Sequence, residues 1–154
     1  MNTGHSRGFL LRASWGWGAV LGAALVIRYL FDTLAPAADY EIRATVLTYT
    51  IVGACLGAGF AAAWRTQSIR AGVLTSSSAS TIGALLSIAG TAVMLGIWHD
   101  PATRDAWRSS GGLDEAFIDV PVKVLALGIT IGAVGAVLGK LAAKSLAAGA
   151  KRSA

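Results

Sequence analysis

The chain has 154 residues, of which 55% are hydrophobic and only 14% are charged, and its mean hydropathy is +0.62. This composition excludes a disordered chain and a collagen-like chain, and the charged fraction is well below the roughly 25% of soluble domains. The formal net charge is +5. Because the basic residues flank apolar segments, this charge indicates membrane topology, and we expect no nucleic-acid partner.

Four apolar stretches predict four transmembrane helices, because each is close to or longer than the about 20 residues that cross a hydrocarbon core. Their ranges are 13–34, 45–64, 71–98 and 118–138. Segments of this length without strand-like alternation satisfy their backbone hydrogen bonds as helices. We therefore predict an all-α integral membrane protein, in which residues 1–154 form a single domain and the four helices pack as two hairpins.

Short polar segments connect the predicted helices. Residues 99–117 form the longest connection. Residues 112–120, which begin in this connection and extend into the fourth predicted helix, are a candidate interfacial helix. Residues 140–154 form a basic tail that we expect to fray. Pro121 falls in the first turn of the fourth helix, where its missing donor is tolerated, or at a kink if that helix begins near Leu113.

Acidic and basic residues are distributed unequally between the two sets of connections. One set contains both termini and the segment between the second and third helices, and it carries eight basic residues and no acid: Arg7, Arg12, Arg65, Arg70, Lys140, Lys144, Lys151 and Arg152. The other set carries all eight acids and five basic residues. The positive-inside rule therefore places both termini in the cytoplasm. Frequent Ala, Gly and Arg residues favour the inner membrane of a bacterium.

A cleaved signal peptide is the alternative for the first helix. Arg7 and Arg12 precede an apolar run, and Ala35-Pro36-Ala37 resembles a cleavage site. The apolar run is long, however, and Arg28 and Asp32 interrupt it near its end. These features favour an uncleaved membrane helix, and the intact mass of the purified protein distinguishes the two interpretations.

Glycine spacing is the strongest structural signal, because glycines in the fourth helix recur at intervals of four, three and four residues on one face. Without a Cβ, two helix backbones can approach closely. The candidate packing glycines are Gly18 and Gly22 in the first helix, Gly53 and Gly57 in the second, Gly83 and Gly90 in the third, and Gly128, Gly132, Gly135 and Gly139 in the fourth. Two hypotheses follow: these glycines pack the four-helix bundle, or the fourth-helix stripe binds another subunit.

Hydroxyl groups form a stripe on the third helix at Ser77, Ser80, Ser87 and Thr91. The stripe either lines a water-filled path or bonds to helix backbones within the bundle. Cys55 is the single cysteine, so no intramolecular disulfide forms. It lies in an apolar run, and we interpret it as a small packing residue.

Four ionisable residues near the outer ends of the first and fourth helices form a candidate charged cluster: Arg28, Asp32, Asp119 and Lys123. Arg28 and Lys123 lie about six residues inside these ends, which is roughly 9 Å below the interface. Each acid is four residues from its basic partner and on the same helix face. If the two helices are neighbours, the four residues form one intramembrane cluster of functional interest. The alternative is that the two basic side chains extend to the interface and pair locally.

No enzyme motif is present: the sequence contains no Walker loop, no HExxH and no GxSxG. His99-Asp100 beside Pro101 fits a loop, and His5 and His99 have no metal-binding spacing. We therefore predict no catalytic residue, no metal and no cofactor.

These observations favour a small non-catalytic accessory or structural helical-bundle subunit. Its partners are the lipid bilayer and, in a homo-oligomer or a larger membrane complex, other protein chains. The alternative is a small-solute or ion transporter or channel that works as an oligomer, with the charged cluster in the outer leaflet as its site. A membrane enzyme is a third alternative without a supporting motif.

Overall fold

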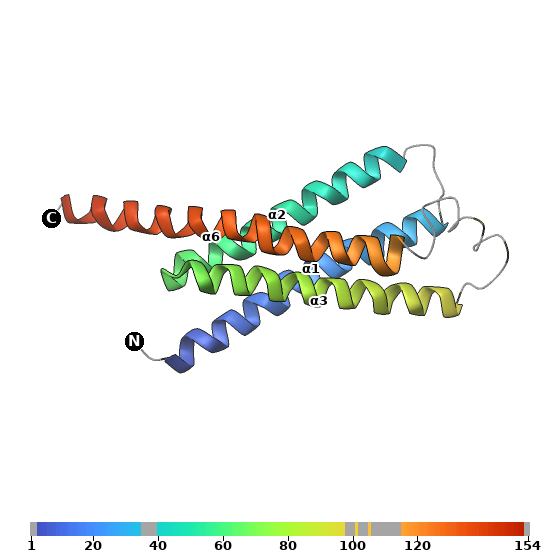
Figure 1. Cartoon of the computed structure of the whole chain (residues 1–154), viewed down its shortest axis with the longest axis horizontal. Coiled ribbons are helices and arrows are strands. Elements are labelled where there is room, and N and C mark those ends of the chain that lie inside the picture. Colours follow the sequence, from blue (N-terminus) through green and yellow to red (C-terminus); the bar gives the residue numbers. More distant parts are fainter. Residues whose placement is uncertain (1–2, 35–39, 98–100, 102–104, 106–114, 153–154) are drawn as a thin grey trace.

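The computed structural model describes residues 3–34, 40–97, 101, 105 and 115–152. Over these residues it contains four long helices and one π-helical turn (Figure 1). The elements are α1 (Thr3–Leu34), α2 (Tyr40–Thr66), α3 (Ile69–Ile97), η1 (Glu115–Asp119) and α6 (Val120–Arg152). Each long helix contains a segment that is long and apolar enough to cross a membrane. The prediction of four such helices in an all-helical chain is confirmed.

The helices extend beyond the apolar stretches that predicted them. α1 begins at Thr3, well before residue 13, and α6 continues to Arg152. In the structure, the basic tail from residue 140 is helical up to Arg152. Its Ala, Leu and Lys residues are strong helix formers, which explains the continuation. At 1.5 Å per residue the 33 residues of α6 span about 50 Å, more than the roughly 30 Å of a hydrocarbon core.

The connection between α2 and α3 is shorter than the expected segment 65–70 and consists of Gln67 and Ser68. Gln67 has a φ of 56°, the left-handed conformation that commonly ends a helix. The Ser68 hydroxyl accepts a hydrogen bond from the Ala71 amide at 3.3 Å, and the Ser68 carbonyl accepts one from the Gly72 amide at 3.2 Å. Ser68 therefore caps the N-terminus of α3.

The start of α6 is preceded directly by the π-helical turn η1. Pro121 is buried in the first turn of α6 and has no amide hydrogen to offer the Phe117 carbonyl, with which its ring would collide in a regular α-helix. The π-helical turn at residues 115–119 is wider than an α-helical turn and accommodates the missing hydrogen bond and the proline ring. Residues 112–114 of the expected interfacial helix, the 35–37 motif and His99-Asp100 lie outside the described residues.

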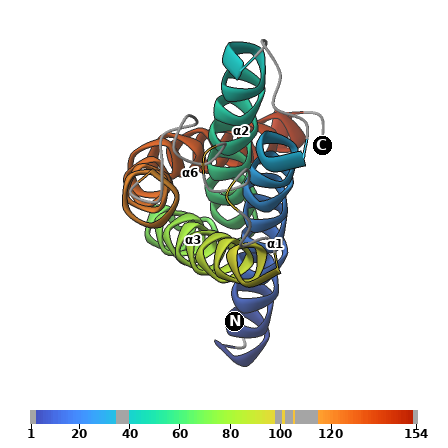
Figure 2. The same cartoon turned by 90° about the vertical axis from the view of Figure 1, so that its right-hand side faces the viewer.

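The closest packing is not between consecutive helices. α1 packs along α3, α2 packs along α6, and α3 also contacts α6 and α2. No Cα atom of α1 lies within 8 Å of a Cα atom of α6, so the backbones of the first and fourth helices do not pack closely together (Figure 2). Both termini lie at one end of the bundle, called here the terminal end, and the opposite end is the distal end (Figure 1).

Apolar side chains lie on the outside of the bundle as well as inside it. One core cluster centres on Leu21, Leu25, Cys55 and Val124, and Tyr29 and Met94 contribute to a second. Many large apolar residues of all four helices are nevertheless more than one-third exposed. A soluble monomer rarely leaves so much contiguous apolar surface in water, and this distribution suits a bundle surrounded by lipid.

The glycine stripe of α6 faces the interior of the same chain. A methyl group at Gly135 would collide with the Leu56 carbonyl of α2, and one at Gly139 would collide with the Phe60 carbonyl. At Gly128 and at Gly132 the corresponding collisions are with serine side chains of α3. The structure thus places this stripe in contact with α2 and α3, where the glycines allow close approach.

Most of the other candidate packing glycines also lie in helix contacts. A methyl group at Gly18 would lie 2.7 Å from the Ile82 Cβ, and one at Gly22 would lie 2.6 Å from the Leu86 Cβ. Gly83 and Gly90 face Leu21 and Val26 of α1, and Gly57 faces the Trp17 ring. Gly53 differs, since no atom lies within 4 Å of a Cβ built there.

Candidate functional site

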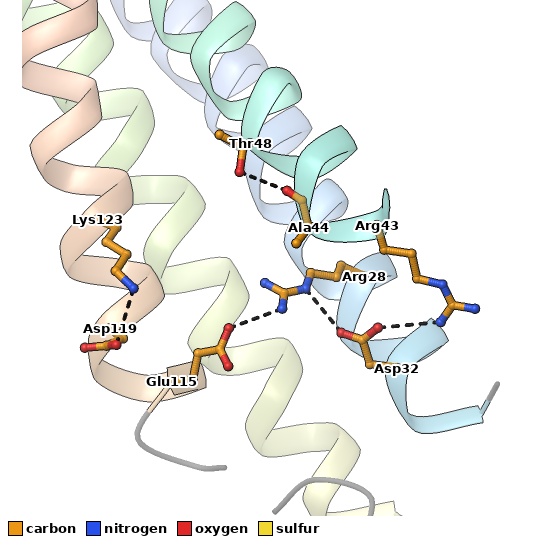
Figure 3. Close-up of polar contacts among 8 residues, drawn as sticks. All are labelled: Arg28, Asp32, Arg43, Ala44, Thr48, Glu115, Asp119 and Lys123. Carbon is orange, nitrogen blue, oxygen red and sulfur yellow. Dashed lines mark hydrogen bonds and ion pairs between the residues drawn. The ribbon is translucent and has the colours of Figure 1, made fainter. Parts of the chain in front are cut away.

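Arg28 is the centre of a buried ion-pair network at the distal end (Figure 3). Its Nε donates to an Asp32 carboxylate oxygen at 3.2 Å, one turn further along α1. Its Nη2 donates to Glu115 Oε1 of η1, also at 3.2 Å. The side chains of Arg28 and Asp32 are only 8% and 7% exposed, and that of Glu115 is 24% exposed. Arg28 thereby connects α1 to the start of the fourth membrane helix.

Arg43 adds α2 to the network. Its Nη1 lies 3.5 Å from the second Asp32 carboxylate oxygen and donates a hydrogen bond to the Phe31 carbonyl at 3.2 Å. Among the described residues, two guanidinium groups therefore face two carboxylates. Buried charges are costly unless they are paired and hydrogen-bonded, and this arrangement satisfies both conditions.

Asp119 and Lys123 form a separate ion pair on the surface of α6. Lys123 Nζ lies 3.4 Å from Asp119 Oδ2, and the two side chains are 69% and 62% exposed. The structure thus brings Arg28 and Asp32 together, but it does not pair Asp119 or Lys123 with them (Figure 3). The physical reason is the direction of the side chains, because Asp119 and Lys123 lie on an exposed face, whereas Glu115 points toward Arg28 (Figure 3).

Sequence reasoning missed two members of the network, Arg43 and Glu115. A signal for both was present, since a guanidinium below the interface needs counter-charges from segments at the same end of the bundle. Glu115 and Arg43 are ionisable residues of such segments. Their pairing depends on how each helix is rotated, which no local spacing in the sequence determines.

Two clefts flank Arg28. The first has a volume of about 440 Å³, lies between α1 and α2, and is mostly apolar, with Ile27, Phe31 and Val46 in its lining. The second has a volume of about 510 Å³, lies mainly between α2 and α6, and has Glu115 and Lys123 in its lining. Both volumes fall in the range of small-molecule sites. The second cleft combines charged and apolar walls, which suits a molecule with a charged head and an apolar body.

The hydroxyl stripe of α3 is packed tightly at its terminal-end half. Ser76 and Ser80 are fully buried against Gly132 and Gly128 of α6. The Ser76 hydroxyl donates to the Cys55 carbonyl at 3.0 Å. At this level the serines are contacts between helices, as in the second of the two interpretations of the stripe.

Cys55 and the distal hydroxyl groups of the α3 stripe also lie inside the bundle. Cys55 is fully buried, with its Sγ 3.5 Å from Ser80 Oγ, as expected of a packing residue. The Ser87 and Thr91 hydroxyls are buried without a hydrogen-bond partner among the described residues. Ser77 is only partly buried, so the stripe expected from helical spacing is rotated slightly from the true interior face.

Within the described residues, no three His, Cys, Asp or Glu side chains gather as a metal-binding group. No family model, curated protein or solved structure matches the chain.

Proposed function

We propose that the chain is a non-catalytic accessory or structural subunit of the bacterial inner membrane, with both termini in the cytoplasm and its helices arranged as two hairpins. The main support for the proposal is that the buried polar side chains of the bundle bind to groups of neighbouring helices and so hold the bundle together. The Arg28 network joins three helical segments, and the Ser76 hydroxyl joins α3 to α2. Such a bundle is a stable scaffold with apolar sides available to lipid and to other membrane helices.

The positions of charges at the two ends support the proposed orientation. Arg65 and Arg70 flank the α2–α3 connection, at the same end as both termini, and Lys140 and Lys144 lie on the part of α6 that leads to the C-terminus (Figure 1). The acids Asp32, Glu115 and Asp119 belong to the distal end. Positive charge favours the cytoplasmic side.

Purification of the C-terminally tagged protein from its native membrane in a mild detergent tests the proposed role. We expect a particle of defined mass that contains additional copies of the chain or other membrane proteins. A monomer that catalyses solute flux after reconstitution would contradict the accessory role.

A second candidate function, solute or ion transport, is favoured by the two clefts beside Arg28. Transport would use the network charges as a binding site, so Arg28→Gln would abolish flux in proteoliposomes while Lys144→Gln would preserve it. Absence of flux above that of protein-free vesicles, under an imposed pH or potassium gradient, would leave the accessory role as the better account.

A further inference from the structure

The side of α3 that faces α6 carries a row of buried hydroxyl groups, and the structure pairs those of its terminal-end half. The Ser76 hydroxyl donates to the Cys55 carbonyl, and Ser80 Oγ lies 3.5 Å from Cys55 Sγ. Ser87 and Thr91, nearer the distal end, are fully buried, and their hydroxyls have no hydrogen-bond partner among the described residues. Burying a hydroxyl group without a partner costs free energy, so these two groups need one.

The packing of α3 against α6 shows what faces the unpaired hydroxyl groups. The two helices run in opposite directions, and a methyl group at Gly128 of α6 would collide with the Ser80 side chain of α3 (Figure 1). Ser87 follows Ser80 by seven residues, and Pro121 precedes Gly128 by seven residues. Because seven residues make almost two full helical turns, Ser87 and Pro121 lie at one level on the facing sides of the two helices. Pro121 is buried, as this position requires.

Thr91 is one turn further along α3 and lies opposite η1, which contacts α3. Met94, the next buried residue on this helix, belongs to one cluster with Ala116, and Phe117 packs against that cluster. Pro121 has no amide hydrogen to offer the Phe117 carbonyl in an α-helical turn or the Ala116 carbonyl in a π-helical turn. A carbonyl group of η1 without a donor in its own helix therefore lies at the level of the two unpaired hydroxyl groups.

These three groups together suit a water molecule. A carbonyl oxygen only accepts hydrogen bonds, whereas each hydroxyl group can donate and accept. A water molecule can donate to the carbonyl, accept from one hydroxyl and donate to the other, which makes the about three hydrogen bonds of a typical buried water. All three groups are neutral, so a cation bound to them would meet no opposite charge in this set.

We propose that a water molecule is bound between α3 and η1, where it donates to the carbonyl that Pro121 leaves free and bonds to the Thr91 and Ser87 hydroxyls. The Arg28–Glu115 ion pair joins α1 to η1, and this water joins α3 to the same turn. Both therefore hold the distorted start of the fourth membrane helix in place. The inference goes beyond the proposed function and applies to an accessory subunit and to a transporter alike.

A double-mutant cycle tests whether the Thr91 hydroxyl and the free carbonyl share one partner. Thr91→Val should raise the unfolding equilibrium constant about fivefold in a detergent titration, the effect of one hydrogen bond of about 1 kcal/mol. In a chain that carries Pro121→Ala the same change should have little effect, because the alanine amide then donates to the carbonyl. Thr81→Val is the matched control, since the exposed Thr81 hydroxyl bonds within its own helix. Equal effects of Thr91→Val with and without Pro121→Ala would overturn the proposal.

Hydroxyl-radical footprinting by brief X-ray irradiation tests whether the shared partner is water. Radicals formed from a water molecule at this site oxidise the nearest reactive side chain, and Met94 is only 5% exposed. We expect Met94 to be oxidised several-fold faster in the wild-type chain than in the double variant Ser87→Ala with Thr91→Val, and the exposed Trp15 to be oxidised equally in both. Equal oxidation of Met94 in the two chains would overturn the proposal in favour of a direct hydrogen bond.

The same two chains distinguish water from a bound cation. We expect the free energy of unfolding of each chain to be the same in sodium chloride and in choline chloride at equal concentration. A wild-type chain that is more stable in sodium chloride, together with a double variant that is not, would assign the site to a cation and overturn the proposal.

Discussion

Gly135→Ala tests whether the contact between α2 and α6 determines the stability of the bundle. A Cβ at this position collides with the Leu56 carbonyl oxygen and lies 3.0 Å from its carbon. Because the obstacle is backbone, no side-chain rotation relieves the collision and the two helices must move apart. Gly53→Ala is the matched control on a membrane helix, since its added methyl group meets no atom within 4 Å.

The expected magnitudes follow from two opposing effects. Replacing glycine with alanine within a helix stabilises it by about 1 kcal/mol, which is the full effect expected at Gly53. Overpacking costs about 1–3 kcal/mol, and a backbone obstacle places Gly135 at the upper end of this range. We therefore expect Gly135→Ala to be about 1–2 kcal/mol less stable than the wild-type chain, and Gly53→Ala to be about 1 kcal/mol more stable.

Titration with sodium dodecyl sulfate in mixed micelles, followed by tryptophan fluorescence and circular dichroism, measures these differences. Gly135→Ala should unfold at a lower detergent fraction than the wild-type chain. If Gly135→Ala and Gly53→Ala unfold at the same detergent fraction, the glycine stripe does not pack as the structure shows and the argument for close α2–α6 contact fails.

Three further predictions concern polar and thiol groups. Arg28→Gln removes the partner that two carboxylates share, so it should lower the free energy of unfolding by about 3 kcal/mol in the same titration. Lys123→Gln on the exposed pair should lower it by less than about 0.5 kcal/mol. Equal losses of stability in the two variants would contradict the difference in burial between the two ion pairs. Ser76→Ala removes a hydrogen bond between helices and should lower the free energy of unfolding by about 0.6 kcal/mol, while Thr81→Ala, whose hydroxyl bonds within its own helix, should leave it unchanged. An unchanged stability of Ser76→Ala would show that the interhelical bond contributes nothing. Cys55 is fully buried and should react with N-ethylmaleimide only after unfolding, as intact-mass measurement would show; rapid labelling of the folded protein would contradict its position.

The four membrane helices were predictable because long apolar stretches have one stable form in a bilayer. Their ends were not, since polar and basic residues at the start of α1 and the end of α6 continue the helix without contributing to hydropathy. The helix from residue 140 to Arg152 shows this most clearly. There the Ala-rich sequence carries enough helix propensity to extend the helix beyond the apolar span.

Only the part of the candidate site that lies within one helix was predictable from the sequence. Arg28 and Asp32 are four residues apart, so their pairing follows from helix geometry alone. The contacts of Arg28 with Glu115 and of Asp32 with Arg43 join different helical segments. They depend on which helices are neighbours, and that order is set by glycine contacts such as those of Gly135. Spacing identified these glycines but gave no indication of which helix each one faces.

Membrane topology is the claim on which every functional argument here depends. Single cysteines introduced by Asn2→Cys, Ser110→Cys or Ser153→Cys can be labelled with a membrane-impermeant maleimide, because Cys55 is buried and contributes no background. In intact spheroplasts we expect labelling at residue 110 alone, and in inverted vesicles at residues 2 and 153. Labelling of the two termini from opposite sides, or of residue 110 from the cytoplasmic side, would contradict the four-helix membrane bundle.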